Sequence, residues 1–418
     1  MNVPSSGGGV ERPERILVVG SRYLGDALLA IPFLRNLRRS CPDATIDVCV
    51  AGAARDALAG CPYVDDVVTW TRPPKGRSPL ASLVNIRAEA AWLRGRGYAR
   101  AYLLKRALST ALLAWLAGIP HRVGYASDGS RPFLTRPVPF RRGRHQVELT
   151  LDLLAADGIA VHDDHNENWI AAEAAALAAP LVDRTPRSRR RVFLAPVSTD
   201  PDRHWPLARW VELVTWMVTT QRCEIFLCGG GADIAAHRAL MGLLPPRVAT
   251  HVHDHSAGVP LVSAGALVGR MDLCVGVDTG LVHLAASFGV PTVVLVGPTD
   301  PNRWAPWGAP HAIVRSPRLR RPLRDRFIGR LGAAHRPEPR WPLGLASVAD
   351  LGVAEVQAAV TALAADTGAR AAPPPAGLRR LDLRTGSWRY EVLGAPASGP
   401  ATGAVAPAEA ATVAAAVR

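Results

Sequence analysis

The segment VGVDTGLVHLAASFGVPTVVLVGPTDP, residues Val275–Pro301, constrains the fold more than any other part of the chain. Two apolar, strand-like runs, Leu273–Val275 and Thr292–Val296, flank a stretch over Leu281–Phe288 whose pattern predicts a helix. The turn Asp278–Gly280 therefore lies between the carboxyl end of a strand and the amino end of a helix. Free N–H groups and the positive end of the helix dipole make such a turn suited to a phosphate or another anion. An N-cap in an ordinary strand–helix unit is the alternative interpretation.

Strand-like and helix-like patterns alternate along the chain, which predicts an α/β fold with parallel sheets. The expected strands are Arg15–Val19, Thr45–Val50, Val67–Trp70, Ala101–Leu104, Val192–Pro196 and Glu224–Cys228, in addition to the two named above. The expected helices are Ala27–Arg39, Leu83–Arg94, Ser109–Ala117, His145–Asp157, Leu207–Thr219, Ile234–Leu243 and Leu351–Ala365.

A length of 418 residues predicts two domains, because a single core rarely grows so large. We expect a disordered N-terminus over 1–14, a first Rossmann-like domain over 15–180, a basic linker over 181–191 and a second Rossmann-like domain over 192–365. Residues 366–418 form a low-complexity tail that we expect to be disordered, with strand-like character only in Leu378–Leu393. The general rule for such sheets places a ligand outside the carboxyl ends of the strands, here in a cleft between the two domains.

The charge of the chain favours anionic partners. Lysine and arginine total 49 against 35 acidic residues, a net charge of +14, and lysine is almost absent. Nucleotides, phosphorylated glycans, acidic lipid surfaces and nucleic acid all fit this charge. The arginines are spread over both domains without a recognised nucleic-acid-binding module, so we expect no nucleic-acid partner. Arg315–Arg340 holds nine arginines, and a solvated basic loop remains an open interpretation of that segment.

The six cysteines form no CxxC pair and no cluster with zinc spacing, and most lie in or beside apolar runs. They are typical of buried thiols in a reducing cytosol. The first fifteen residues lack the apolar core of a signal peptide, and the sequence has no apolar run of 18 residues or more. These features predict a cytoplasmic protein.

Gly20–Asp26 follows the first expected strand. Its glycines are not arranged as GxGxxG, and no acidic residue follows the second strand, so a dinucleotide cofactor is not expected. Asp26 opens the next helix, where its carboxylate can accept a proton from a hydroxyl nucleophile or simply cap the helix.

Three further loops carry polar groups at the ends of strands. Ser198, Thr199 and Arg203 offer hydroxyls and a guanidinium, the groups that bind a diphosphate, although a solvated polar loop is the alternative. Asp233 follows Gly229–Gly231 and can bind ribose hydroxyls, or the glycines can form a plain flexible turn. Asp278 has no second carboxylate in a DxD arrangement, so no metal site is expected there. Gly297–Pro301 adds another loop, followed by Trp304 and Trp307, which either line the site or pack.

The motifs resemble those of glycosyltransferase family 9, the ADP-heptose:lipopolysaccharide heptosyltransferases. The resemblance covers about residues 15–365 and rests on four segments in order: Ser21–Asp26 with Pro32, Ala117–Tyr125, Arg203–Pro206 and Asp278–Pro301. The segment AGIPHRVGY resembles the corresponding segment of the family members that add the second heptose.

The resemblance implies a GT-B fold and inverting transfer without a metal or other cofactor, with the sugar nucleotide as co-substrate. Asp26 matches the family's catalytic base, and Arg203 stands where a lysine often stabilises the leaving diphosphate. The positions that match donor-binding residues are Ser198, Thr199, Asp233, Asp278, Thr279, Gly280, Leu281 and His283, although His283 also suits packing of its helix against the sheet.

The acceptor side departs from the family pattern. Lys105–Ser109 stands where the second-heptose enzymes carry an Asn and a Lys, and Ser316–Pro342 lacks the cysteines and lysines of relatives. We assign Arg22, Lys105, Arg106 and Arg122 to acceptor binding, with a bacterial glycolipid such as lipopolysaccharide core as the acceptor. Peripheral contact with an anionic membrane, at the inner face of the plasma membrane, is compatible with this role. The alternatives are a transferase acting on another bacterial glycan or small molecule, and a non-catalytic relative that binds sugar nucleotides.

Overall fold

The computed structural model describes residues 13–69, 79–200, 203–315, 347–365, 378–382 and 388–392. The chain divides into two compact units. The first comprises Met1–Tyr23, Ala30–Arg142 and Val147–Asp164, and the second comprises Leu24–Leu29, Gly143–Gln146 and His165–Arg418. The sequence predicts a linker at 181–191, whereas the structure changes units at 164–165. The reason is that α7 (Ala172–Asp183) packs against α11 (Leu261–Val268) of the second unit.

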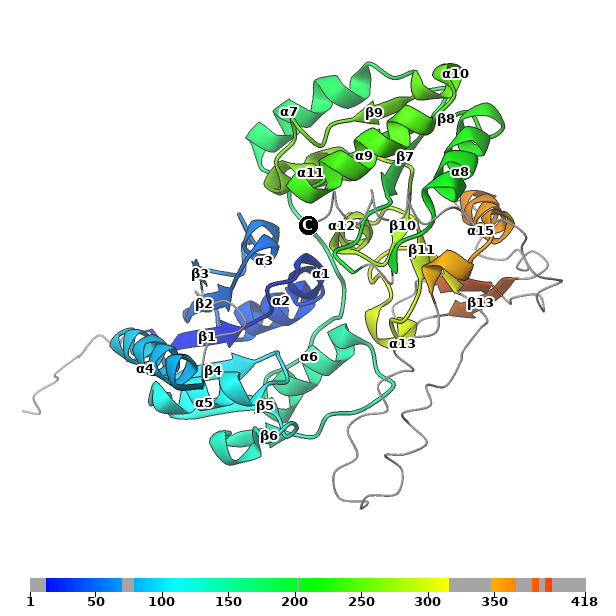
Figure 1. The fold of residues 1–418 in the computed structure, drawn as a ribbon. Coiled ribbons are helices and arrows are strands. Elements are labelled where there is room, and N and C mark those ends of the chain that lie inside the picture. Colours follow the sequence, from blue (N-terminus) through cyan, green and yellow to red (C-terminus); the bar gives the residue numbers. More distant parts are fainter. Residues whose placement is uncertain are drawn as a thin grey trace, which may run out of the picture. The chain divides into compact units, whose positions relative to one another are not determined.

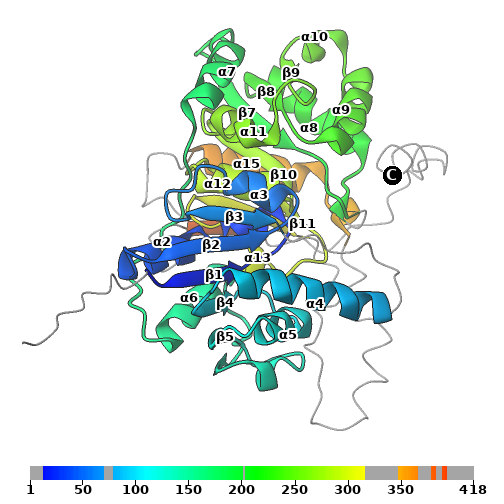
Figure 2. The ribbon, with the colours of Figure 1, turned by 90° about the vertical axis from the view of Figure 1, so that its left-hand side faces the viewer.

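The first unit contains a six-stranded sheet in which every strand pairing is parallel. Its strands lie in the order β3-β2-β1-β4-β5-β6, and Figure 2 shows β1, β2 and β3 side by side. This is the strand order of a Rossmann sheet. The strands are β1 (Arg15–Val19), β2 (Thr45–Val50), β3 (Asp66–Thr69), β4 (Arg100–Leu103), β5 (His121–Tyr125) and β6 (Arg136–Val138). The accompanying helices are α2 (Ile31–Ser40), α3 (Ala53–Ala57), α4 (Pro79–Gly95), α5 (Leu108–Leu116), η1 (Arg131–Phe133) and α6 (Gln146–Ala156).

The sequence predicts one helix over 27–39, but the structure contains two. A short helix, α1 (Leu24–Leu28), precedes α2, and Pro32 lies in the first turn of α2. Proline suits a first turn, where its missing N–H costs nothing, but it would interrupt a continuous helix. The separation has a structural consequence. The segment Leu24–Leu29 groups with the second unit, while its neighbours in the sequence belong to the first.

The second unit repeats the same topology. Its sheet has eight strands in the order β13-β14-β12-β11-β10-β7-β8-β9, and the six from β9 to β12 have the Rossmann order. These strands are β7 (Arg190–Ala195), β8 (Cys223–Leu227), β9 (Val252–Asp254), β10 (Leu273–Val277), β11 (Thr292–Val296) and β12 (His311–Arg315). The remaining helices are α8 (Leu207–Thr219), α9 (Gly231–Leu243), α10 (Pro246–Ala249), α12 (Gly280–Ser287), α13 (Pro301–Trp304), η3 (Val348–Asp350) and α15 (Val353–Ala365). Figure 1 shows α8 and α15 on one side of this sheet and α11 and α12 on the other.

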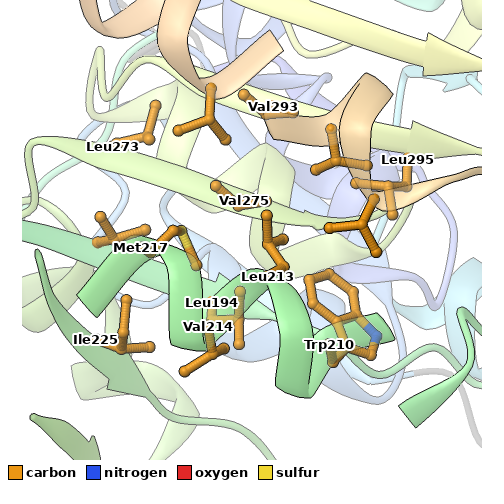
Figure 3. Close-up of a cluster of buried hydrophobic side chains, with 14 of the residues drawn as sticks. Leu194, Trp210, Leu213, Val214, Met217, Ile225, Leu273, Val275, Val293 and Leu295 are labelled. Carbon is orange, nitrogen blue, oxygen red and sulfur yellow. The ribbon is translucent and has the colours of Figure 1, made fainter. Parts of the chain in front are cut away.

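The core of the second unit lies between its sheet and α8 and α15. The apolar face of α8 repeats at helical spacing through Trp210, Leu213, Val214, Met217 and Val218, all of them buried. These side chains pack on Leu194, Ile225, Val275 and Leu295 of four neighbouring strands (Figure 3). This packing holds the strands from which the loops of the site leave.

Two short strands in the C-terminal tail extend the second sheet. β13 (Leu378–Asp382) pairs antiparallel with β14 (Trp388–Val392), which lies parallel to β12. The tail is therefore not wholly irregular, and the strands fall in the segment for which the sequence shows strand-like character. The predicted disordered N-terminus over 1–14, except for its last two residues, lies outside the described residues, as does nearly all of the Arg-rich segment 315–340. Within the described residues, no helix combines the length and the apolar character needed to span a membrane.

Candidate active site

The site lies in the second unit, where the loops after β7 and β10 leave the sheet. These two strands are parallel neighbours, with Ala195 opposite Gly276. The strand order reverses between them, because β8 and β9 continue on one side and β11 and β12 on the other. Loops that diverge at such a point, at the carboxyl ends of the strands, form the usual ligand site of an open α/β sheet.

An ion pair joins the two loops. Arg203, in the loop after β7, donates from Nη1 to the backbone oxygen of Asp278 at 3.0 Å and lies 3.2 Å from its Oδ2. The Nε of Arg203 is also 3.5 Å from a carboxylate oxygen of Asp200. The Asp278 side chain is buried, whereas 31% of the Arg203 side chain is exposed. The guanidinium is therefore fixed beside the start of α12 and still reaches solvent, where an anionic ligand can meet it.

The loop that carries Arg203 is held at several points. Buried Ser198 accepts a hydrogen bond from the Asp200 N–H at its Oγ, 3.2 Å away, and its carbonyl oxygen lies 2.7 Å from His204 Nε2. The indole of Trp205 donates to the Leu351 carbonyl at 2.9 Å. Thr199 is exposed. The structure therefore brings Ser198, Thr199 and Arg203 together in an anchored loop.

The turn after β10 opens α12. Asp278 donates its N–H to the Leu295 carbonyl at 3.1 Å, and Thr279 is the N-cap residue in an extended conformation. The Thr279 side chain makes no capping hydrogen bond to the described residues, so the plain N-cap interpretation of this turn gains no support. Gly280 and Leu281 begin the helix, and the positive end of its dipole lies at this point. This arrangement can hold a phosphate group.

His283 and Asp26 complete the cluster. His283 is buried in the first turns of α12, with its Nε2 3.8 Å from Asp278 Oδ1. Burial lowers the pKa of His283 below its usual 6.5, the charges of Asp278 and Asp26 oppose that change, and Arg203 adds to it. The imidazole is therefore neutral at neutral pH. Asp26 lies in the first turn of α1, partly exposed, and not at an N-cap. The catalytic base and the donor residues that the sequence predicts thus share one unit.

Asp233 has a structural role that the sequence does not reveal. Its Oδ2 accepts a hydrogen bond of 2.6 Å from the Gly230 N–H at the start of α9. Burial raises the pKa of this carboxyl, and the Gly230 N–H and His237 partly offset the effect. A Cβ at residue 229 would lie 2.2 Å from Asp233 Oδ2, so the glycine makes room for the cap. One carboxylate oxygen is therefore already committed, which limits the ribose role assigned to Asp233.

The four residues assigned to the acceptor belong to the first unit. Arg22 is exposed and stacks on Tyr23, with its guanidinium carbon 4.9 Å from the ring centroid. Lys105 and Arg106 follow the carboxyl end of β4. The guanidinium carbon of Arg106 lies 4.1 Å from the Phe140 ring centroid, and its Nη2 lies 3.3 Å from Asp128 Oδ2.

Arg122 is different, because it lies near the amino end of β5, opposite Ala101. Its guanidinium donates to the carbonyl oxygens of Ile119, Pro120 and Phe133, and burial lowers its pKa. The structure therefore does not bring Arg122 together with Lys105 and Arg106. Arg122 instead stabilises a turn near the amino ends of the strands, whereas Lys105 and Arg106 follow the carboxyl end of β4.

Three features of the site do not follow from sequence patterns. Asp200 and His204 fix the loop of Arg203, and Gly25 gives α1 its close contact with α12. The only sequence signal for them is their position next to residues singled out for other reasons.

Trp307 packs rather than lining the site, since its ring stacks on His145 with centroids 4.3 Å apart. Among the described residues, no group of three or more His, Cys, Asp or Glu side chains is placed to hold a metal ion.

Comparison with known proteins identifies the family of the chain. The model of glycosyltransferase family 9 (heptosyltransferase) matches residues 86–326, more than half of the chain. Lipopolysaccharide heptosyltransferase 2 of Escherichia coli K12 is 24% identical over 319 residues, covering 72% of this chain and 88% of its own. Lipopolysaccharide heptosyltransferase 1 of Pseudomonas aeruginosa is 29% identical over 307 residues, which cover 70% of this chain and 81% of that enzyme.

Solved structures show the same fold. A family 9 glycosyltransferase from Veillonella parvula superimposes with a TM-score of 0.66 at 21% identity, over 86% of this chain and 99% of that one. The E. coli ADP-heptose lipopolysaccharide heptosyltransferase II gives a TM-score of 0.64 at 21% identity, over 85% and 100%. The predicted α/β fold of the GT-B class, with two Rossmann-like domains, is confirmed. The chain belongs to glycosyltransferase family 9 and is a glycosyltransferase.

Proposed function

We propose that the protein transfers a heptose from ADP-heptose to a glycolipid of the lipopolysaccharide core, with inversion at the anomeric carbon. The observation that carries this proposal is the convergence of Asp26, Arg203, Asp278 and the start of α12 within one unit. A carboxylate, a guanidinium and a helix N-terminus are the groups that such a transfer requires.

The reaction is a single displacement. Asp26 takes the proton of an acceptor hydroxyl, whose oxygen attacks the anomeric carbon as the bond from that carbon to the diphosphate oxygen breaks. The electron pair of that bond leaves with ADP, so negative charge grows on the diphosphate. Arg203 and the N-terminus of α12 stabilise that charge. We propose that these groups serve without a metal ion, so that the sugar nucleotide is the only small molecule that transfer requires besides the acceptor.

The donor assignment rests on relatives. One E. coli relative of known structure is described as an ADP-heptose heptosyltransferase, and another was solved with ADP-2-deoxy-2-fluoro heptose. A thermal-shift comparison of ADP-, GDP- and UDP-linked sugars tests the assignment. We expect stabilisation by ADP and ADP-heptose only. Stronger stabilisation by a UDP- or GDP-sugar would overturn the choice of donor.

An acceptor other than the inner core is a second candidate, because of the loop after β4. Arg106 contacts Phe140 and Asp128 in this loop, for which the family resemblance leads us to expect an Asn and a Lys. A transfer assay that offers heptose-terminated core and heptose-free core side by side separates the two candidates. We expect the first to be used. Use of neither core by a protein that still binds ADP-heptose would favour another bacterial glycan.

Contact with an anionic membrane is part of the same proposal, since the acceptor is a glycolipid. On α5, Leu108 and Trp115 are exposed by 43% and 49%, and Trp115 meets Phe133 edge to face. Arginines flank this face: Arg94 donates to the Leu116 carbonyl, and Arg131 is exposed. Tryptophan beside arginine suits a lipid–water interface. Co-sedimentation with phosphatidylglycerol vesicles tests it. We expect binding that is reduced by Trp115→Ser, and equal binding to neutral vesicles would contradict it.

A further inference from the structure

Two glycines allow α1 and α12 to lie unusually close together. A Cβ at residue 25 would stand 2.8 Å from Cδ2 of His283, and a Cβ at residue 280 would stand 2.7 Å from Cβ of Leu24. Real Cβ atoms essentially never show contacts this short. Neither glycine has a positive φ, so close approach rather than backbone conformation explains the residue type.

The two contacts are reciprocal. The His283 ring of α12 fills the space left by Gly25 in α1, while Leu24 of α1 covers Gly280 of α12. Both side chains are buried, His283 at 5% and Leu24 at 9% exposure. Glycine inside a helix costs about 1 kcal/mol relative to alanine, so a glycine retained within a short helix such as α1 calls for a packing reason.

The contact determines what lies beside the proposed base. Asp26 follows Gly25 directly, and its charge acts on the His283 imidazole. The same ring has Asp278 Oδ1 at 3.8 Å. The imidazole is therefore the shared neighbour of the base and of the donor turn.

We propose that Gly25 and His283 are a size-matched pair of positioning residues, which sets the place of Asp26 relative to the donor turn, and that Gly280 and Leu24 fix the same contact from the other side. The proposal rests on the proposed role of Asp26 as the base. His283 acts here through its shape, as a neutral ring, and carries no proton in the reaction.

Thermal unfolding tests the contact without any reference to activity. We expect Gly25→Ala to lower Tm by about 3 °C or more, and to lower it much less in a His283→Ala background, where the ring no longer obstructs the new methyl group. Gly242→Ala is the matched control, because a Cβ at this helical glycine of the same unit meets no atom within 4 Å. Its Tm should stay level or rise. If the Tm losses of Gly25→Ala and His283→Ala simply add in the double variant, the two residues are not a matched pair and the proposal is overturned.

Steady-state kinetics tests the positioning role. Gly25→Ala should lower kcat by about 10-fold or more, because small displacements of a reacting group are costly, while the donor KM and the Kd for ADP stay within about twofold of wild type. In the His283→Ala background the same change should cost no more than about twofold in kcat. Unchanged kcat in Gly25→Ala, or an ADP affinity that falls in step with kcat, would contradict the proposal. If the wild type transfers no sugar, the proposed function fails, and the Tm cycle still decides whether the pair exists.

Discussion

Replacing Arg203 by alanine should destabilise the second unit as well as weaken donor binding. The lost contacts are the 3.0 Å hydrogen bond to the Asp278 carbonyl and the 3.2 Å ion pair with its carboxylate. Coulomb attraction at that separation is worth about 1 kcal/mol at the dielectric constant of water and about 5 kcal/mol at an effective value of about 20. The value is nearer the lower limit, because nearly a third of the Arg203 side chain is exposed. The variant also leaves the Asp278 carboxylate buried without its partner, so we expect a loss of roughly 2 kcal/mol.

Urea unfolding followed by tryptophan fluorescence measures this loss. Arg247→Ala is the control, because Arg247 is exposed and forms no ion pair with the described residues, so its unfolding free energy should change by less than about 0.5 kcal/mol. Adding Asp278→Asn to Arg203→Ala should recover part of the stability, since no unpaired charge then remains. Calorimetry with ADP should show an affinity about 10- to 100-fold lower for Arg203→Ala. A stability equal to that of the Arg247 control would refute the role of the ion pair in the site.

Four other predictions follow from the same geometry. Asp26→Asn should lower the transfer rate by about 10²- to 10⁴-fold and leave the Kd for ADP unchanged; an active variant would exclude Asp26 as the base. Because burial depresses the pKa of His283, its contribution to stability is full above pH 6.5 and declines as the pH falls toward the lowered value. The difference in unfolding free energy between wild type and His283→Gln should therefore shrink on acidification below 6.5, and a constant difference would contradict this. EDTA should leave turnover unchanged, and a loss restored by a divalent cation would contradict transfer without a metal. Leu213→Ala, at a fully buried position of α8, should cost about 2–5 kcal/mol in urea unfolding, and a loss below about 1 kcal/mol would contradict its place in the core.

The sequence predicts the architecture well where apolar runs are short and clearly bounded. β1 (Arg15–Val19), β2 (Thr45–Val50) and β11 (Thr292–Val296) have the predicted bounds, and α12 begins one residue before the predicted helix. The alternation of strands and helices occurs twice along the chain and therefore implies two Rossmann-like sheets. The handedness of each strand–helix–strand connection limits where the next strand can be placed.

The predictions that differ from the structure involve tertiary contacts. The break between α1 and α2 depends on Pro32, but the attachment of α1 to the second unit depends on packing at Gly25 and Gly280, which no periodicity reveals. Asp233 has the residue type of a ribose ligand, and its hydrogen bond to the Gly230 N–H becomes visible only with coordinates. Arg122 lies at the amino end of its strand, so a motif that correctly indicates the family does not place that side chain.

The proposed reaction can be measured directly in a transfer assay with purified protein, ADP-heptose and a heptose-terminated core glycolipid. Mass spectrometry of the glycolipid and quantification of released ADP measure both halves of the reaction. We predict one heptose added for each ADP released, with inverted anomeric configuration, and no product from Asp26→Asn. ADP release without sugar on the glycolipid, or a retained configuration, would contradict an inverting transfer that uses Asp26 as base and Arg203 at the diphosphate.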